Sequence, residues 1–269
     1  MFHPLSSLDP QQEKVRRKRR KRLSDEIVNP GTMILLYHTR FSRKRQTSFY
    51  DCNGDIKAIF QRYSFMQYRR MLMIIDLYTD YACPFCFIQR KTIQKLGVDA
   101  LFEPQFMEIH PQVPMDGTAL EDIASKAYVE RIKAQLEESG CHYGIQLQRG
   151  STVFNSRRAI VLRAFLCARY RPETVEAYDT LLYRAYNVEG KNIASPAFLQ
   201  LILDSLGLPI PVEAALADPS AQLKADQVRA RAITRRIQVT PSLVWKDTVY
   251  PGLHTEQALL RFLETHNIL

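Results

Sequence analysis

The stretch "MLMIIDLYTDYACPFCFIQR", residues 71–90, brings together a buried strand, a tight connection and the start of a helix. Its first part, "MLMIIDLY", is short, apolar and followed by polar residues, which predicts a buried strand. From Cys83 onward apolar residues recur at helical spacing, and Gly97 is a helix stop signal. We therefore expect a strand that leads directly into a helix, with Cys83 and Cys86 on the first turn of that helix.

The segments that follow predict an α/β chain. "DALFEPQFMEIHP" (99–111) alternates like a second strand, so strand, helix and strand form a unit with two parallel strands and a right-handed crossover. Five segments with apolar residues about 3.6 positions apart come next, and we expect them to pack as a helical subdomain. The first should run unbroken from a capping box at Thr118 and Glu121 to Gly140. The five predicted helices cover 118–140, 155–170, 172–190, 195–208 and 219–237.

The strand period returns near the C-terminus. "PSLVWKDTVY" (241–250) is typical of a hairpin with "KD" near its turn. "TEQALLRFLETH" (255–266) follows as an amphipathic helix that begins after a Thr cap. The predicted order is strand, helix, strand, five helices, two strands and a last helix.

The spacing of Cys83 and Cys86 predicts redox chemistry. At the exposed N-terminus of a helix, free backbone N–H groups and the helix dipole favour a thiolate, which lowers the pKa of Cys83 below the usual value of about 8.5. Cys86, three positions on, faces the same side and is close enough for a disulfide. Neither Pro84 nor Phe85 adds a charge or a side-chain donor, so the backbone N–H groups and the dipole must lower the pKa.

Two other interpretations of the cysteine pair stay open. Zinc would need four ligands, usually as two pairs, and the chain has no second C-x-x-C and no spaced histidine pair. Cys141 and His142 are adjacent, which is a poor spacing for one tetrahedral site. The two thiols could also be packed and inert. We expect Cys141 and Cys167 to be small, packed hydrophobic residues of this kind.

These features together resemble the DsbA-like thioredoxin superfamily and, within it, the FrnE-like branch. The matching stretches span residues 71–269 in order: "DYACPFC", "FEPQFMEIHPQVPMDG", "FNSRRAIVLRA", "LLYRAYNVEGKNIAS" and "VTPSLVW" with "GLHTEQALLRFL". The resemblance implies a thioredoxin-like fold, made of 71–112 and 238–269, with an all-helical subdomain, 113–237, inserted between its second and third strands. It also implies dithiol–disulfide oxidoreductase or isomerase activity without a bound cofactor.

The resemblance assigns roles by position. Cys83 looks like the nucleophile, Cys86 like the resolving thiol and Pro241 like a cis-proline opposite the cysteines. A cis X-Pro bond presents the backbone of the preceding residue, so Thr240 should pair with a substrate strand near Cys83. Pro84 and Phe85 complete the predicted substrate-binding residues. Two departures are visible, because the branch usually has Trp at the position of Phe85 and Val at that of Thr240.

Two carboxylates flank the end of the first predicted strand. Asp76 and Asp80 lie before the cysteine pair, and either could accept the proton of Cys86. A capping or surface role is the alternative for both.

The first seventy residues differ in composition from the rest. Residues 1–70 hold 16 Lys and Arg against 6 Asp and Glu, and residues 71–269 hold 21 against 22, so the net charge of +9 belongs to the first segment. The basic tract 14–23 could be a nuclear-import signal, a nucleic-acid-binding arm or part of an organelle-targeting peptide. We expect instead that 1–70 is a disordered extension, or that translation starts at Met71 or Met73.

Composition narrows the cellular setting. The cysteines are few and odd in number, at positions 52, 83, 86, 141 and 167, which argues against a secreted disulfide scaffold and favours a reducing location, the cytoplasm. No stretch reaches the ~18–20 apolar residues that cross a bilayer, so we expect no membrane partner. Nucleic acid is not an expected partner except through 14–23, and a homodimer stays open.

Three functions compete at this point. The first is a thiol–disulfide oxidoreductase that acts on protein or small-molecule disulfides. The second is a glutathione-dependent isomerase or transferase of the same superfamily, with glutathione as co-substrate. The third is a non-catalytic binding module built on the thioredoxin scaffold.

Overall fold

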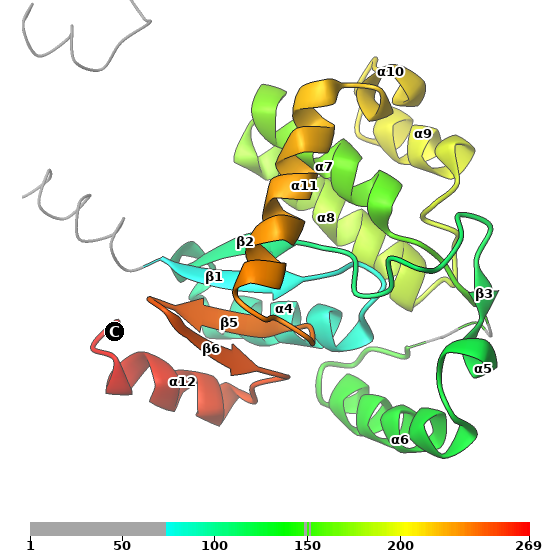
Figure 1. Ribbon diagram of the computed structural model, residues 1–269. Helices are drawn as coiled ribbons and strands as arrows, with labels where there is room; N and C mark the ends of the chain where they lie inside the picture. The colour runs from blue at the N-terminus through cyan, green and yellow to red at the C-terminus, as the bar shows by residue number, and fades with distance from the viewer. Residues whose placement is uncertain (1–73, 148–149, 151) are drawn as a thin grey trace, which may run out of the picture. The chain divides into compact units, whose positions relative to one another are not determined.

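The computed structural model describes residues 74–147, 150 and 152–269 (Figure 1). The basic extension, Cys52 and the alternative starts at Met71 and Met73 lie outside these ranges. None of the described helices is both long enough and apolar enough to cross a membrane.

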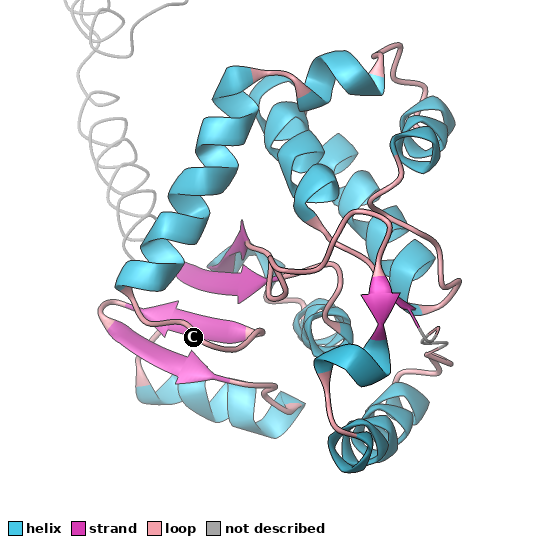
Figure 2. Cartoon of the chain, turned by 45° about the vertical axis from the view of Figure 1, so that its right-hand side comes forward, coloured by secondary structure: helices cyan, strands magenta, loops and turns pink. Residues whose placement is uncertain are grey.

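A mixed four-stranded sheet forms the base of the fold, in the order β2-β1-β5-β6 (Figure 2). The strand β1 pairs in parallel with β2 and antiparallel with β5, and β5 forms a hairpin with β6. Both the parallel pair and the hairpin are as predicted, although the strands are shorter than the predicted segments. Their bounds are β1 Ile75–Thr79, β2 Phe102–Phe106, β5 Ser242–Trp245 and β6 Thr248–Pro251.

The alternation of side chains along the strands builds a core on each face of the sheet. Leu77 and Leu243 pack with side chains of α4 (Pro84–Leu96) and α12 (Glu256–Thr265). The next residues, Tyr78 and Val244, point to the opposite face and pack against α11 (Pro219–Thr234). Figure 1 shows α12 and α11 on opposite sides of the sheet.

The helix α4 has the bounds that its sequence predicts. Cys83 is its N-cap, and Pro84 occupies the first turn, where a missing N–H costs no helical hydrogen bond. Gly97 ends the helix in the left-handed conformation, with φ of 66°, which glycine adopts without a steric penalty. The short 3₁₀ turn Asp99–Leu101 then leads into β2.

The segment between β2 and β5 is the predicted helical insertion, and it carries the largest apolar cluster of the described residues. Capping residues define several of its helices: Ser195 caps α9 and Asp218 caps α11 through side-chain oxygens. The short α10 was not predicted. The bounds are α5 Leu120–Ile123, α6 Lys126–His142, α7 Arg157–Arg169, α8 Pro172–Asn187, α9 Pro196–Ser205 and α10 Val212–Leu216.

The prediction of one unbroken helix over 118–140 is wrong. Thr118–Ala119 form a strand, β3, that pairs antiparallel with β4 (Thr152–Val153). The main helix α6 starts only after Ser125, whose hydroxyl accepts the N–H of Tyr128. Strand pairing with a distant segment therefore replaces the capping box, and the insertion is helical except for this small sheet.

Candidate active site

The first cysteine lies at the junction between the β1 loop and α4. Cys83 has an extended backbone (φ −97°, ψ 112°), and its carbonyl accepts the N–H groups of Cys86 and Phe87 at 3.1 and 3.3 Å. Its own N–H donates to the carbonyl of Asp80 at 3.2 Å. The helix end predicted for Cys83 is therefore present, but its side chain is more covered than predicted: Cys83 is 7% exposed and Cys86 is 1% exposed.

The loop before β5 covers the Cys83 sulfur. The Thr240–Pro241 peptide bond is cis, as the sequence analysis expected. The Cys83 thiol donates to the Thr240 carbonyl at 3.2 Å. The Pro241 carbonyl accepts the N–H of Gly252 at 2.8 Å, which holds the loop against the β6–α12 connection. Residues 157 positions apart are thus brought into contact at the cysteine pair.

The environment of Cys83 favours its thiolate. Burial by itself raises the pKa of Cys83, but hydrogen bonding from the Cys86 side chain, the Thr240 side chain and the Cys86 backbone N–H outweighs burial. The pKa of Cys83 is therefore lowered, but the side chains of Cys86 and Thr240 contribute more than the backbone N–H groups on which the prediction relied. The negative charge of Asp80 acts in the opposite direction.

The environment of Cys86 favours its thiol. Burial, the hydrogen bond to Cys83 and the charge of Cys83 raise the pKa of Cys86 well above its ordinary value. The side chains of Thr240 and Thr79 favour its thiolate, but they do not overcome the larger effects. The site thus favours the thiolate form of Cys83 and the protonated form of Cys86.

Asp80 is the buried carboxyl group next to the pair. Its two oxygens accept the N–H groups of Ala82 at 3.1 Å and Ile109 at 2.8 Å, which ties the cysteine loop to the segment after β2. Burial raises the pKa of Asp80 to about 6, and the hydrogen bonds from Ile109, Ser156 and Ala82 oppose that rise. The other candidate, Asp76, instead pairs with Arg235 at 2.5 Å.

The structure brings the predicted cysteines and the predicted loop together. Pro84 is buried in the first turn of α4, and Phe85 is partly buried against the same apolar cluster as both cysteines. Thr240 Oγ1 is buried without a hydrogen-bond partner of standard geometry, although it lies close enough to affect both sulfurs. The catalytic and substrate-binding roles of these residues stay predictions.

Two predictions about the other cysteines are wrong. Cys141 and Cys167 are both exposed, so neither is a packed hydrophobic residue. They lie on outward-facing positions of α6 and α7, which the apolar stripes of these helices did not reveal. Sequence reasoning also missed Thr79 and Tyr183, whose hydroxyl groups meet beside Cys86.

The zinc alternative finds no further support among the described residues. Within 74–147, 150 and 152–269, no three His, Cys, Asp or Glu side chains gather closely enough to hold a metal ion.

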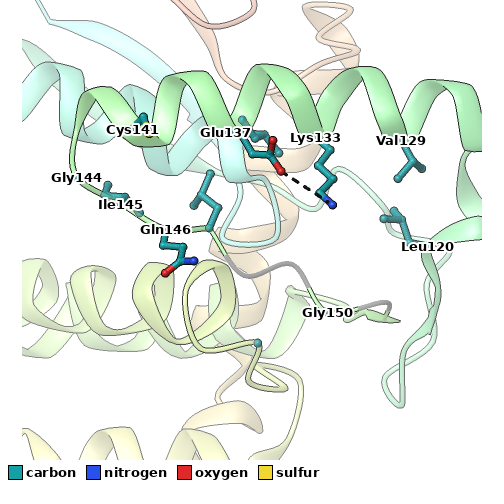
Figure 3. A pocket seen from close by; sticks show the side chains of 12 residues that line it. Leu120, Val129, Lys133, Glu137, Cys141, Gly144, Ile145, Gln146 and Gly150 are labelled. Carbon is teal, nitrogen blue, oxygen red and sulfur yellow. Dashed lines mark ion pairs between the residues drawn. The ribbon is translucent and has the colours of Figure 1, made fainter.

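A separate cavity of about 1080 Å³ lies between α6 and the segment that follows it (Figure 3). Val129 and Lys133 line one side, and Ile145 and Gln146 line the other (Figure 3). Cys141 also lines it. None of the six predicted site residues does, so the cavity is distinct from the cysteine pair.

Comparison with known proteins identifies the family. A family model described as "DSBA-like thioredoxin domain" matches residues 74–264. This chain belongs to the DSBA-like thioredoxin domain family. The family resemblance and the predicted fold are therefore confirmed, whereas the FrnE-like branch stays a prediction. None of the curated proteins matches the chain.

Solved structures share the fold of this DSBA-like thioredoxin domain at low sequence identity. A probable DsbA oxidoreductase from Streptomyces coelicolor has a TM-score of 0.60 and 19% identity, over 72% of this chain and 89% of the other. A 2-hydroxychromene-2-carboxylate isomerase has a TM-score of 0.56 and 21% identity, over 72% and 95%. The cytosolic disulfide reductase DsbM from Pseudomonas aeruginosa, solved with glutathione, has a TM-score of 0.51 and 16% identity, over 73% of this chain and 100% of the other.

Proposed function

We propose that this chain is a thiol–disulfide oxidoreductase whose redox pair is Cys83 and Cys86. The observation that carries the proposal is the opposite influence of the site on two neighbouring thiols. The pKa of Cys83 is lowered by hydrogen bonding at the start of α4, and the pKa of Cys86 is raised by burial and by Cys83. The thiolate is the nucleophile in disulfide exchange, so we assign the first attack to Cys83.

The exchange proceeds in two steps. Cys83 attacks one sulfur of a substrate disulfide, the substrate S–S bond breaks, and the leaving sulfur takes up a proton. Cys86 then loses its proton and attacks Cys83, the mixed disulfide breaks, and the second substrate sulfur leaves as a thiol. Two electrons pass to the substrate, and Cys83 and Cys86 end as a disulfide. The reverse sequence oxidises a dithiol.

The Thr240 carbonyl gives the site a place for an extended substrate. It accepts the Cys83 thiol when Cys83 is protonated, and ionisation of Cys83 frees it for a backbone N–H of the substrate. Phe85 lies partly buried next to the pair and would contact the substrate side chains. We therefore propose protein or small-molecule disulfides and thiols as substrates.

The recycling partner and the location belong to the same proposal. One structural neighbour was solved with glutathione, and we propose glutathione as a co-substrate that reduces or oxidises the pair. The whole chain has few cysteines, and their number is odd, which favours the cytoplasm as its location.

The test is an insulin-reduction assay with Cys86→Ala and Cys83→Ser variants, run beside a glutathione-binding assay. Both variants should lose turnover, and Cys86→Ala should accumulate the mixed disulfide on Cys83. Retained turnover in Cys86→Ala would favour a glutathione-dependent isomerase or transferase, which needs only one sulfur. No turnover in the unaltered protein with any disulfide would favour a binding module.

The reduction potential of the pair, titrated against glutathione, gives the direction of electron flow. A value near −270 mV would mark a reductase, and one near −120 mV would mark an oxidant.

A further inference from the structure

Two buried hydroxyl groups, those of Thr79 and Tyr183, belong to the surroundings of Cys86. Thr79 is the last residue of β1, and Tyr183 lies on α8, 104 positions further along the chain. Their oxygens are 2.5 Å apart, and each residue is 2% exposed. A hydroxyl from the helical insertion thus reaches the end of the strand that carries the redox loop.

The position of Tyr183 is held by its neighbours. Its ring stacks on Phe87, the residue after Cys86, with ring centres 5.8 Å apart and planes 11° apart. The ring of Tyr81 meets it edge-on at 5.1 Å. The Asn187 amide donates to the carbonyls of both tyrosines, at 2.9 and 3.1 Å. The Tyr183 hydroxyl therefore has a defined direction toward Thr79.

The buried Tyr183 hydroxyl is protonated and can donate this hydrogen bond. Burial raises the pKa of Tyr183 well above its ordinary value, so the phenol keeps its proton at any working pH. Within the part of the chain that the structure describes, its hydroxyl has one hydrogen-bond partner, Thr79 Oγ1. The distance allows either hydroxyl to donate. With Tyr183 as the donor, the Thr79 proton is free to point toward Cys86, whose thiolate the Thr79 side chain favours.

We propose that Tyr183 and Thr79 form a directed hydrogen-bond chain that stabilises the Cys86 thiolate as it attacks the mixed disulfide. In this proposal Thr79 donates to the Cys86 sulfur, and Tyr183 is a positioning residue that acts through Thr79. The inference rests on the proposed function and deepens it, because it gives the helical insertion a part in the second step.

The chain matters most when Cys83 is bound to substrate. In the mixed disulfide Cys83 carries no charge and accepts no proton from Cys86, so two of the effects that keep Cys86 protonated disappear. Burial alone then opposes ionisation, and the hydroxyls of Thr79 and Thr240 favour it. The attack forms the Cys83–Cys86 bond and breaks the Cys83–substrate bond. The proton released by Cys86 ends on the leaving substrate thiol.

The experiment follows the two steps separately. The reduced full-length protein is mixed with 5,5′-dithiobis(2-nitrobenzoate), whose released thiolate is coloured. Cys83 releases one equivalent at a rate that depends on reagent concentration, and Cys86 releases a second at a rate that does not. That independence separates the second phase from reactions of the exposed Cys141 and Cys167. The rate of the second phase is measured across pH.

Thr79→Val should raise the midpoint of the pH dependence of the second phase by about one unit. Thiol nucleophilicity rises with pKa (Brønsted slope about 0.4–0.5), so the rate should be about threefold lower below the midpoint and about threefold higher above it. Tyr183→Phe should shift the midpoint in the same direction by less. Thr79→Ser keeps the hydroxyl and should match the unaltered protein.

Tyr178→Phe is the matched control. Tyr178 is a buried tyrosine of the same helix, but its hydroxyl donates to the Ala159 carbonyl at 2.9 Å, away from the cysteines. Its loss should leave the midpoint unchanged.

Two outcomes would count against the chain. Midpoints in Thr79→Val and Tyr183→Phe equal to that of Tyr178→Phe would overturn this inference and leave the proposed function standing. Absence of a concentration-independent phase in the unaltered protein would overturn both.

Discussion

The two sides of the cysteine pair are built from different parts of the chain. On the Cys83 side lie connecting segments: the start of α4, the Thr240–Pro241 loop and Asp80. On the Cys86 side lie the interior of the sheet and the aromatic side chains of α8. The same functional group has a lowered pKa on the first side and a raised pKa on the second. Hydrogen bonding from Cys86 and Thr240 outweighs burial at Cys83, whereas burial and the interactions with Cys83 dominate at Cys86.

The largest effect should come from variants that keep only one thiol of the pair. In Cys83→Ser, Cys86 keeps the burial that is the largest cause of its raised pKa. In Cys86→Ala, Cys83 keeps the hydrogen bonds from Thr240 and from the backbone N–H of position 86, so iodoacetamide should label Cys86 about tenfold more slowly at neutral pH than it labels Cys83. Mass spectrometry of the peptide that carries both positions measures the two rates without interference from other cysteines. Equal labelling rates would contradict the difference in pKa between Cys83 and Cys86.

The Thr240 hydroxyl sharpens the Cys83 side. It is buried, has no partner of standard geometry, and lowers the pKa of Cys83. Thr240→Val should raise the pKa of Cys83 by up to about one unit, and Thr240→Ser should not, as measured by thiolate absorbance against pH. An unchanged titration in Thr240→Val would remove this hydroxyl from the account.

Asp80 should make folding stability depend on pH. Its pKa is about 6 in the folded chain against an ordinary 3.8, so the folded state holds a proton that the unfolded state releases between these values. The contribution of Asp80 to stability is therefore greatest at low pH and falls as pH rises through about 6. From pH 5 to pH 7 the free energy of unfolding should fall by about 1 kcal/mol more in the unaltered protein than in Asp80→Asn. Urea unfolding at pH 5 and at pH 7 measures this difference. An equal fall in the free energy of unfolding in the two proteins would contradict the prediction.

Asp76 should show the smallest effect. Asp76 lies on β1 and pairs with Arg235 at a partly exposed position, so Asp76→Asn should cost less than about 1 kcal/mol of stability. The thiolate titration of Cys83 should not move. A clear shift would mean that charges beyond the immediate surroundings set the reactivity of the pair.

Local signals made the strand and helix that flank the cysteine pair predictable from the sequence. Each of these signals acts on neighbouring residues. An apolar run defines β1, and Pro84 in the first turn and Gly97 after the last turn define α4. The hairpin of β5 and β6 and the Thr255 cap of α12 were predictable for the same reason. The family resemblance supplied the position of Pro241 opposite the cysteines.

Contacts between distant segments were not predictable in this way. The helical pattern over 118–140 hid the pairing of Thr118 with Val153, because a strand partner far along the chain leaves no local mark. The meeting of Thr79 with Tyr183 depends on the packing of α8 against α4, which periodicity does not specify. The exposure of Cys141 likewise depends on which side of α6 faces the remaining helices.

The most direct test of the account is the thiolate absorbance of the reduced protein minus that of the oxidised protein, titrated across pH. The difference isolates the Cys83–Cys86 pair from the other cysteines. We predict two steps, the first below the ordinary thiol value of about 8.5 and the second well above it. A first step at or above that value would contradict the claim that the start of α4 holds Cys83 ready as a thiolate.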